Sequence, residues 1–262
     1  TFSNMNLEDK DVSLIPHLQK LSEDHISFSN TKGFGGANQV RGTTWTAGSL
    51  VGQTSGIPIQ ISKPNTSFGE EGGFLDGLTT IGEVLEDQGY HNYFLIGSDA
   101  RFGGRETYFK THGNYKIMDI KYYKEIGKID EDYNVFWGYE DKKLFEHAKE
   151  ELLEISKGSQ PFNLTMLTVD SHFTEGYVDE SCDLIYEENY PNAILCSNNK
   201  IIEFVNWIKA QDFYENTTVI LSGDHYTMNN VFAQDMNNED RSIFNTFINV
   251  DVSTLDTANF MK

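Results

Sequence analysis

Apolar residues recur along this chain with two kinds of spacing, and together they predict helices that alternate with short buried strands. Apolar residues three or four positions apart predict amphipathic helices over residues 13–24, 140–156 and 198–210. A further helix begins after Thr79 or Thr80, either of which can cap it, and ends at Gly89. Continuous apolar runs predict strands at residues 26–28, 93–96, 161–169, 217–221 and 244–250.

This alternation indicates the fold class. Near-continuous apolar strands are typical of parallel sheets that are covered by helices on both faces. We therefore expect an α/β fold with a mostly parallel central sheet and helices on both faces. Residues 62–77, rich in Gly and Ser, predict a surface loop, and the charged residues 121–132 predict a peripheral segment.

Chemically useful side chains follow three of the predicted strands. Asp99 comes after the strand at 93–96, His172 after the strand at 161–169, and the pair Asp224 and His225 after the strand at 217–221. In open α/β sheets, ligands bind beyond the carboxyl ends of the strands. The sequence therefore predicts a site at this edge of the sheet.

A second candidate region, residues 39–50, combines small residues, hydroxyls and Arg41, and it continues as a predicted short helix. A hydroxyl just before a helix N-terminus lies where backbone N–H groups point outward and the helix dipole favours negative charge. Thr43 is therefore a candidate nucleophile toward a phosphate group. The alternative is that this hydroxyl only caps the helix.

Asp224 and His225 offer a carboxylate oxygen and an imidazole nitrogen side by side. This pair suits Mn²⁺, Zn²⁺ or Mg²⁺ better than a metal that prefers thiolates, although such pairs also act as loop caps. A divalent metal beside Thr43 would lower the pKa of its hydroxyl and orient it for attack.

The loop at 97–105 adds positive charge to the predicted site. Arg101 and Arg105 can stabilise charge on a phosphoryl or sulfuryl group under attack, unless they are solvated loop residues. His172 can bind the same group or transfer a proton, and its alternative is a structural role.

The composition of the chain limits which partners it can bind and indicates where in the cell it is found. The 262 residues suffice for one large α/β domain or two small ones. The net charge of −20 makes nucleic acid a poor partner, because phosphate backbones require basic surfaces. No run of eighteen apolar residues and no signal peptide occur. Since the sequence begins at Thr1 without Met, we interpret it as an excised domain whose parent protein can carry a membrane anchor.

The chain has two cysteines, Cys182 and Cys196, in a polar segment rich in Tyr and Asn. Two cysteines that close a short surface loop fit a disulfide formed in an oxidising compartment. The alternative is two unrelated reduced thiols.

Five motifs follow one another along most of the chain, at residues 42–46 with 56–58, 89–94, 99–104, 168–172, and 222–225 with 228–230. In this order they resemble the motifs of the membrane-anchored phosphoglycerol transferases that modify periplasmic glucans. This group belongs with the lipoteichoic acid synthases in the alkaline phosphatase/sulfatase superfamily. The placement of Cys182 and Cys196 is also similar to the glucan-modifying branch.

The resemblance implies a single sulfatase-like catalytic domain over residues 1–262. It implies Thr43 as a metal-bound nucleophile, with Asp224 and His225 as metal ligands, and His172 and Arg105 as substrate-binding residues. Lipoteichoic acid synthases carry a further His near Ile96, which this chain lacks, so Asp99 or Arg101 is expected to reshape that part of the pocket. The family's remaining metal ligand is a Glu at the end of a first strand, which we expect to lie upstream of Thr1.

The reaction implied by the resemblance has two steps. Thr43 takes glycerol phosphate from a phosphatidylglycerol-type donor at the membrane surface, and a sugar hydroxyl of an envelope glycan or teichoic acid-type acceptor then receives it. The expected metal is Mn²⁺, with Mg²⁺ or Zn²⁺ as alternatives, and the expected location is the extracytoplasmic face of a bacterial membrane. A true sulfatase is disfavoured, because sulfatases convert a Cys or Ser into formylglycine.

Two other functions stay open from the sequence. One is a metal-dependent phosphodiesterase or phosphatase that releases glycerol phosphate to water. The other is a non-catalytic paralogue that binds an anionic glycan, favoured by the missing Glu.

Overall fold

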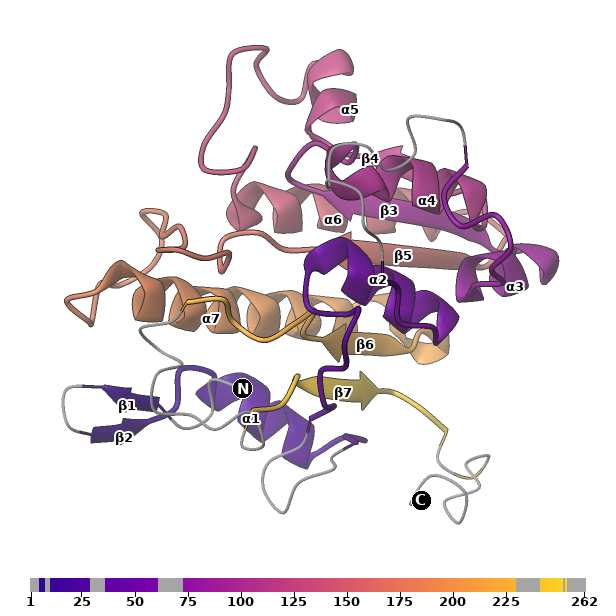
Figure 1. Ribbon diagram of the computed structural model, residues 1–262. Helices are drawn as coiled ribbons and strands as arrows, with labels where there is room; N and C mark the ends of the chain where they lie inside the picture. Colours follow the sequence, from indigo (N-terminus) through magenta and orange to yellow (C-terminus); the bar gives the residue numbers. More distant parts are fainter. Residues whose placement is uncertain are drawn as a thin grey trace.

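Three parallel strands form the central sheet (Figure 1). β3 (His91–Ile96) lies in the middle, with β4 (Lys116–Met118) on one side and β5 (Phe162–Leu167) on the other. Because the three strands run in the same direction, their carboxyl ends meet at one edge of the sheet. The computed structural model describes residues 5–7, 10–28, 36–60, 73–229, 241–251 and 253.

Helices cover both faces of this sheet, and successive residues of β3 point to opposite sides. On one face, Phe94 and Ile96 are buried against α2 (Thr46–Ser55) and α4 (Arg105–Thr111). On the other face, Leu95 packs in a second core. That core is built with α5 (Ile120–Glu125), α6 (Asp141–Ile155) and α7 (Asn189–Lys209). The predicted α/β class with helices on both faces is confirmed.

A two-stranded antiparallel unit extends the fold beyond α7 (Figure 1). It consists of β6 (Val219–Ser222) and β7 (Asn245–Ile248), and α1 (Pro16–Glu23) packs between β7 and α7. The remaining short elements are β1 (Met5–Leu7), β2 (Lys10–Val12), α3 (Ile81–Asp87) and two 3₁₀ turns, η1 (Phe102–Gly104) and η2 (Asp212–Asn216). Among the described residues, no helix combines the length and the apolar character that crossing a membrane requires.

Local signals set several helix ends as predicted. Thr80 caps α3 in a capping box: its N–H donates to Glu83 Oε2 over 2.8 Å, and its side chain accepts from the N–H of Glu83. Gly89 follows this helix with a φ of +82°, a conformation that favours glycine. α6 coincides with the predicted helix to within one residue at each end.

Four expectations differ from the structure. Residues 26–28 form no strand, since Ile26 makes only an isolated bridge to Phe247. α7 begins nine residues before the predicted start, because Pro191 is tolerated in a first helical turn and the Asn-rich sequence obscures the helical pattern. The segment 121–132 is not peripheral throughout, since Tyr123 of α5 is fully buried. The strands predicted at 217–221 and 244–250 are not part of the parallel sheet: as β6 and β7 they pair antiparallel with each other in a separate sheet. In addition, α4 and β4 were not predicted. The expected loop at 62–77 lies mostly outside the described residues.

A buried acidic cluster fastens the start of α6 to the end of β5. The Asp141 carboxylate accepts hydrogen bonds from the N–H groups of Val169 (2.8 Å) and Asp170 (3.1 Å), and Asp170 Oδ2 accepts from the Asp141 N–H (3.0 Å). Lys200 of α7 pairs with Asp179, and its Nζ lies 3.6 Å from Asp170 Oδ2. Two of the three carboxylates, those of Asp170 and Asp179, therefore lie beside one buried ammonium group. Burial is the main cause that raises the pKa of Asp141 and of Asp170.

Asp170→Asn should make stability less sensitive to rising pH. A carboxyl whose pKa is raised in the folded protein binds its proton more tightly there than in the unfolded chain, so its contribution declines as pH rises from about 4 toward neutrality. We expect the free energy of unfolding of the variant, relative to the parent, to rise by up to about 1.4 kcal/mol per pH unit in that window. Urea unfolding at a series of pH values measures this difference.

Asp179→Asn is the matched control within the same cluster. Burial raises the pKa of Asp179, but the Lys200 and Ser181 hydrogen bonds outweigh it and hold that pKa below its ordinary value. The stability that the Asp179 carboxylate contributes is therefore lost as pH falls. We expect Asp179→Asn to change the free energy of unfolding mainly at acidic pH. If the free energy of unfolding depended on pH in the same way in both variants, the opposite pKa shifts of Asp170 and Asp179 would be contradicted.

Cys182 and Cys196 are joined by a disulfide across 14 positions, with Cα atoms 5.6 Å apart. Cys196 lies buried within α7 and not in a surface loop, so the bond ties the segment before this helix to the core. Reduction should lower the free energy of unfolding by about 3 kcal/mol, as expected for a loop of this length. Chemical unfolding with and without reductant measures the change, and the Cys182→Ala/Cys196→Ala protein should not respond. An equal response of both proteins would refute the prediction.

Candidate active site

The candidate site is organised around one polar side of α2. Thr46, Ser49 and Gln53 follow one another at helical spacing and face the segment after β6. Ser49 Oγ donates to the Asp224 carbonyl, and Gln53 Nε2 donates to the Gly223 carbonyl over 2.9 Å. The first helical residue, Thr46, is thereby held beside Asp224.

Three potential ligand atoms converge at the N-terminus of α2. Thr46 Oγ1 donates to Asp224 Oδ2 over 3.1 Å and lies 3.5 Å from His225 Nε2. Asp224 Oδ2 and His225 Nε2 are 3.2 Å apart. The three atoms form a nearly equilateral triangle of one hydroxyl oxygen, one carboxylate oxygen and one imidazole nitrogen.

This triangle fits a divalent cation. With metal–ligand bonds of about 2.1 Å, neighbouring ligands of a tetrahedral or octahedral site are separated by about 3.0–3.4 Å. The hydroxyl, carboxylate and imidazole donors are those that Mn²⁺, Zn²⁺ and Mg²⁺ accept in proteins. Thr46, Asp224 and His225 are therefore the residues that would hold the metal.

The hydrogen bonding of His225 leaves the correct nitrogen available. His225 Nδ1 lies 2.8 Å from the Tyr226 carbonyl oxygen. Because a carbonyl only accepts hydrogen bonds, Nδ1 carries the proton in the neutral ring, and Nε2 presents its lone pair toward Thr46 and Asp224. The Tyr226 N–H in turn donates to Gln39 Oε1 over 2.7 Å, which fixes this loop.

Among the described residues, no third carboxylate or imidazole joins Asp224 and His225. In the described part of the chain, one group of three His, Cys, Asp or Glu side chains is close enough to hold a metal; it consists of Asp179, Cys182 and Cys196, whose sulfurs are joined in the disulfide. The position expected for the Glu ligand of the family resemblance, upstream of Thr1, is outside these residues.

Thr43 occupies a different place from the one expected of a metal-bound nucleophile. Its Oγ1 donates to the Val40 carbonyl over 2.9 Å, and its N–H bonds the same oxygen over 3.1 Å. These bonds close the turn that precedes α2. The structure therefore brings Thr46 to Asp224 and His225 and leaves Thr43 in the preceding turn.

A sequence signal for Thr46 exists and was missed. Thr46, Ser49 and Gln53 are spaced i, i+3 and i+7 along one side of the helix, and the buried Ala47, Leu50 and Val51 lie on the neighbouring side. This spacing predicts a polar helix side that starts at Thr46. Which hydroxyl in residues 43–46 faces the polar side becomes clear only when the first residue of the helix and its rotation are known.

Arg105 lies close to the start of α2, with its side chain buried. If Gly103 carried a Cβ atom, that atom would lie 3.4 Å from the Cβ of Ala47. The loop before α4 therefore contacts the first turn of α2. One terminal Arg105 nitrogen donates to the Asp99 carbonyl over 2.8 Å, while Nε is buried with no hydrogen-bond partner. Burial lowers the pKa of Arg105 to about 10, so the guanidinium stays charged at neutral pH.

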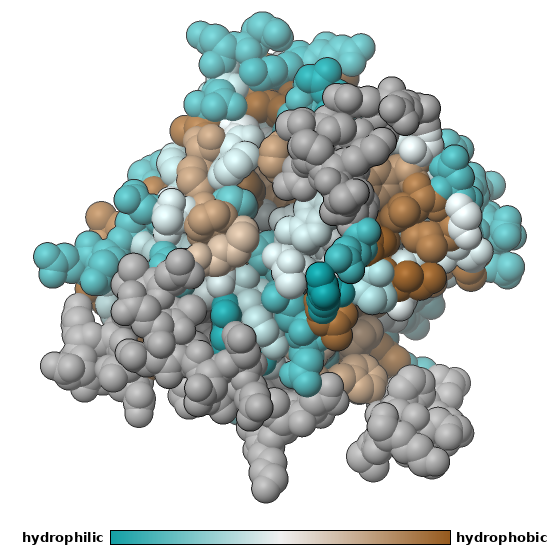
Figure 2. All heavy atoms as spheres, viewed as in Figure 1, coloured by the Kyte–Doolittle hydropathy of each residue, from teal (hydrophilic) through white to brown (hydrophobic). Residues whose placement is uncertain are grey.

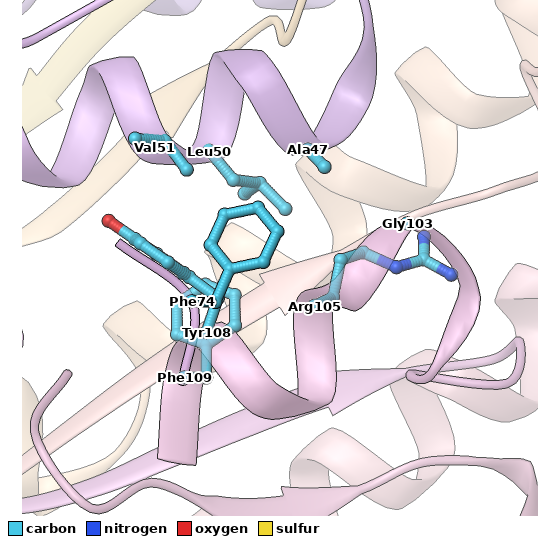
Figure 3. Close-up of a pocket in the computed structure, with 8 residues that line it drawn as sticks. All are labelled: Ala47, Leu50, Val51, Phe74, Gly103, Arg105, Tyr108 and Phe109. Carbon is cyan, nitrogen blue, oxygen red and sulfur yellow. The ribbon is translucent and has the colours of Figure 1, made fainter. Parts of the chain in front are cut away.

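The pocket beside Arg105 is apolar. It lies between α2 and α4 and is lined by Ala47, Leu50, Val51, Phe74, Gly103, Arg105, Tyr108 and Phe109 (Figure 3). In this view the guanidinium extends toward Gly103, away from the rings of Phe74, Tyr108 and Phe109. The pocket has no room for a water molecule, so we interpret it as a packing gap and not as a substrate site.

Asp99 and Arg101 pair with each other at the surface. Arg101 donates to Asp99 Oδ2 over 3.0 Å, and Lys121 lies 2.9 Å from the same oxygen. Burial raises the pKa of Asp99, but hydrogen bonds from Arg101 and Lys121 outweigh it and hold that pKa well below its ordinary value. Both side chains are engaged in this ion pair, and the backbone of Asp99 supports Arg105.

His172 lies in the loop after β5. Its Nδ1 is 2.6 Å from the Phe173 carbonyl oxygen, so Nδ1 is the donor and Nε2 is available. Asn229 Nδ2 donates to the Thr174 carbonyl over 2.8 Å and joins this loop to the segment after His225. Asp99 and His172 follow β3 and β5 at the carboxyl edge of the parallel sheet as predicted, whereas Asp224 follows β6 of the separate antiparallel pair.

Comparison with known proteins agrees with this architecture. The sulfatase family model matches residues 1–242. The chain is 31% identical over 235 residues to phosphoglycerol transferase I of Citrobacter koseri, a match that covers 87% of this chain and 30% of the relative. The chain thus spans less than a third of that relative's length.

Two solved structures share the fold. A protein of the alkaline phosphatase superfamily from Vibrio parahaemolyticus superposes with a TM-score of 0.67 at 23% identity, covering 90% of this chain and 54% of that one. The lipoteichoic acid synthase LtaP from Listeria monocytogenes superposes with a TM-score of 0.70 at 18% identity, covering 94% and 61%. The chain therefore belongs to the sulfatase family and has the fold of the alkaline phosphatase superfamily.

Proposed function

We propose that this chain is the catalytic domain of a metal-dependent phosphoglycerol transferase, with Thr46 as its nucleophile. The convergence of Thr46 Oγ1, Asp224 Oδ2 and His225 Nε2 within 3.1–3.5 Å carries this proposal. The 31% identity to a phosphoglycerol transferase supports the choice of transferred group. Thr46 replaces Thr43 in this role because Thr43 is engaged in the preceding turn.

The site supplies a hydroxyl where negative charge is favoured. Thr46 is the first residue of α2, so unpaired backbone N–H groups and the positive end of the helix dipole lie beside its oxygen. A bound divalent cation would lower the pKa of this hydroxyl and offset charge on the phosphoryl oxygens. Arg105 adds a buried positive charge with one unpartnered N–H group.

In the first step, Thr46 Oγ attacks the phosphorus of a glycerophospholipid. The new Oγ–P bond forms as the bond from phosphorus to the diacylglycerol oxygen breaks. The hydroxyl proton moves toward Asp224 Oδ2, its acceptor in the structure. His172 enters this step as an imidazolium protonated on both ring nitrogens; it gives the Nε2 proton to the leaving oxygen and keeps the Nδ1 proton on the Phe173 carbonyl. The product is a phosphoglycerol ester of Thr46.

In the second step, a sugar hydroxyl attacks the same phosphorus. Its proton passes to His172 Nε2, the Oγ–P bond breaks, and Thr46 recovers its proton from Asp224. His172 thus acts first as an acid and then as a base. A threonine cannot mature into formylglycine, which separates this chemistry from sulfate-ester hydrolysis by sulfatases.

The substrates follow from the same chemistry. The donor is a phosphatidylglycerol-type lipid at a membrane surface, and the acceptor is a glycan or teichoic acid-type polymer of the cell envelope. Mn²⁺ is the metal that we propose. The disulfide supports an extracytoplasmic location, because such bonds persist in oxidising compartments.

Thr46→Ala should abolish turnover, whereas Thr43→Ala should retain it to within about tenfold. Loss of a covalent nucleophile typically costs at least about a thousandfold in rate. Transfer of label from phosphatidylglycerol carrying a radiolabelled glycerol headgroup to a glucose oligosaccharide measures both variants. Peptide mass mapping of the quenched protein should find the phosphoglycerol ester on Thr46. Loss of activity in Thr43→Ala with retention in Thr46→Ala would reverse the assignment.

The same assay distinguishes the alternative functions. Label found only as free glycerol phosphate would identify a phosphodiesterase. Absence of lipid cleavage in the metal-loaded protein, together with retained glycan binding, would identify a non-catalytic paralogue. Either result would overturn the transferase proposal.

Asp224→Asn should weaken metal binding. A metal that binds only the folded protein raises the free energy of unfolding by about 2.7 kcal/mol at a hundredfold excess over its Kd. We expect Mn²⁺ to raise the melting temperature of the parent and to have a much smaller effect on this variant. Asp99→Asn, which changes a surface carboxylate outside the ligand triangle, is the matched control. An equal response of all three proteins would exclude Asp224 as a ligand.

A further inference from the structure

Three exposed aromatic side chains form a cluster beside the candidate site. Phe102, Phe136 and Trp137, here named the aromatic platform, are 46%, 38% and 43% exposed. The rings of Phe102 and Trp137 are 5.8 Å apart between centroids, and those of Phe136 and Trp137 are 6.5 Å apart. Large rings grouped at the surface of a folded protein commonly mark a binding site.

The backbone is strained at the turn that carries two of these rings, Phe136 and Trp137. Phe136 has a φ of +53°, a conformation that is rare for a bulky residue. The turn around it is closed by the Val135 N–H, which donates to the Gly138 carbonyl over 2.7 Å. Strained residues of this kind occur where the surrounding structure holds them for function.

The turn is anchored directly to the end of β3. Gly138 forms an antiparallel bridge with Ser98, and the Tyr139 N–H donates to the Gly97 carbonyl over 3.0 Å. A Cβ on Gly138 would lie 2.1 Å from the Gly97 oxygen, so this close approach requires glycine. The platform is thereby fixed to the loop that carries Arg105.

The aromatic platform is continuous with the residues proposed to handle phosphate. The Trp137 and His172 rings lie 4.7 Å apart, and the Arg105 guanidinium carbon is 5.6 Å from the Phe102 ring centre. A ligand resting on the platform would therefore lie beside the groups that bind and protonate the reacting phosphate.

We propose that the aromatic platform is the acceptor subsite and binds a neutral pyranose ring of the glycan. The C–H face of a sugar ring is apolar and packs against an aromatic ring, while its hydroxyls stay in water or point toward the reaction. This inference rests on the proposed transferase function. It assigns Trp137 to acceptor binding, a role independent of donor recognition by Arg105.

Charge and surface pattern favour a sugar over a lipid surface. The chain carries a net charge of −20, which disfavours a wide contact of the platform with an anionic bilayer and does not repel a neutral sugar. On the face seen in Figure 2, hydrophobic residues lie in separate groups among hydrophilic ones. The platform has three rings, an area that suits one or two sugar units and not a pair of acyl chains.

The test is direct binding of laminaritetraose, a neutral glucose tetrasaccharide, by isothermal titration calorimetry. Trp137→Ala should raise the Kd about tenfold, the loss expected for one aromatic contact, and Trp137→Phe should restore most of the affinity. Leu153→Ala is the matched control, because this apolar side chain is 46% exposed and lies on α6 away from the platform. Thermal melting of each variant checks that it is folded.

A second arm separates the sugar from the lipid. Trp137→Ala should leave co-sedimentation with phosphatidylglycerol vesicles at the parent level and should raise the KM for the tetrasaccharide about tenfold, in line with its Kd. Loss of vesicle binding with unchanged affinity for the tetrasaccharide would overturn the proposal in favour of a lipid contact. Equal Kd values for Trp137→Ala and Leu153→Ala would also overturn it.

Binding does not require turnover, so the two proposals fail in different ways. Thr46→Ala protein should bind the tetrasaccharide with the parent Kd. Turnover retained by Thr46→Ala would remove the proposed nucleophile while leaving the platform result intact. Unchanged binding in Trp137→Ala would remove the platform while leaving the nucleophile intact.

Discussion

The contact between α2 and the segment after β6 is the interaction on which the candidate site depends. Ser49 and Gln53 bond the carbonyls of Asp224 and Gly223, and these bonds set both the rotation and the height of the helix. Once the helix is held in this way, its first residue, Thr46, meets Asp224 and His225. A helix rotated by one residue would move its side chains by about 100° around the axis and present a different group.

The central sheet supplies the frame for this contact. Phe94 and Ile96 on one side of β3 pack with α2, while Leu95 on the other side packs with α6 and α7. Parallel strands end at one edge, so the loops after β3 and β5 reach the same side of the molecule. The buried carboxylates of Asp141 and Asp170 then join α6 to the end of β5, directly before His172.

The site combines groups with separate tasks. Thr46, Asp224 and His225 form a ligand triangle, Arg105 contributes a buried charge, and the aromatic platform offers an apolar surface. Thr46 and Arg105 are the first residues of α2 and α4, whereas Asp224 and His225 follow β6. The turn that carries Phe136 and Trp137 is held to the end of β3 by backbone hydrogen bonds and a close glycine contact. This division resembles that of other enzymes, in which a rigid sheet positions reactive groups carried on loops.

Much of the fold was predictable from the sequence, because its signals are local. The capping box at Thr80, the glycine at position 89 and the apolar period of α6 act over a few residues, and the structure agrees with them. The polar residues after strands also predicted that Asp99 and His172 follow strands that end at one edge, as they do after β3 and β5, whereas Asp224 follows β6 of the separate antiparallel pair. The helical start of α7 was missed because tertiary packing stabilises a first turn that its polar sequence does not favour.

The sequence by itself determined the fold class and placed Asp224 beside His225 after a predicted strand. Only the tertiary structure decided which hydroxyl meets that pair, because Thr46 and Asp224 are 178 residues apart. It also decided that Phe102, Phe136 and Trp137 gather beside His172. Local patterns fix the spacing of residues along one element, whereas the relative rotation of two elements depends on packing between distant parts of the chain.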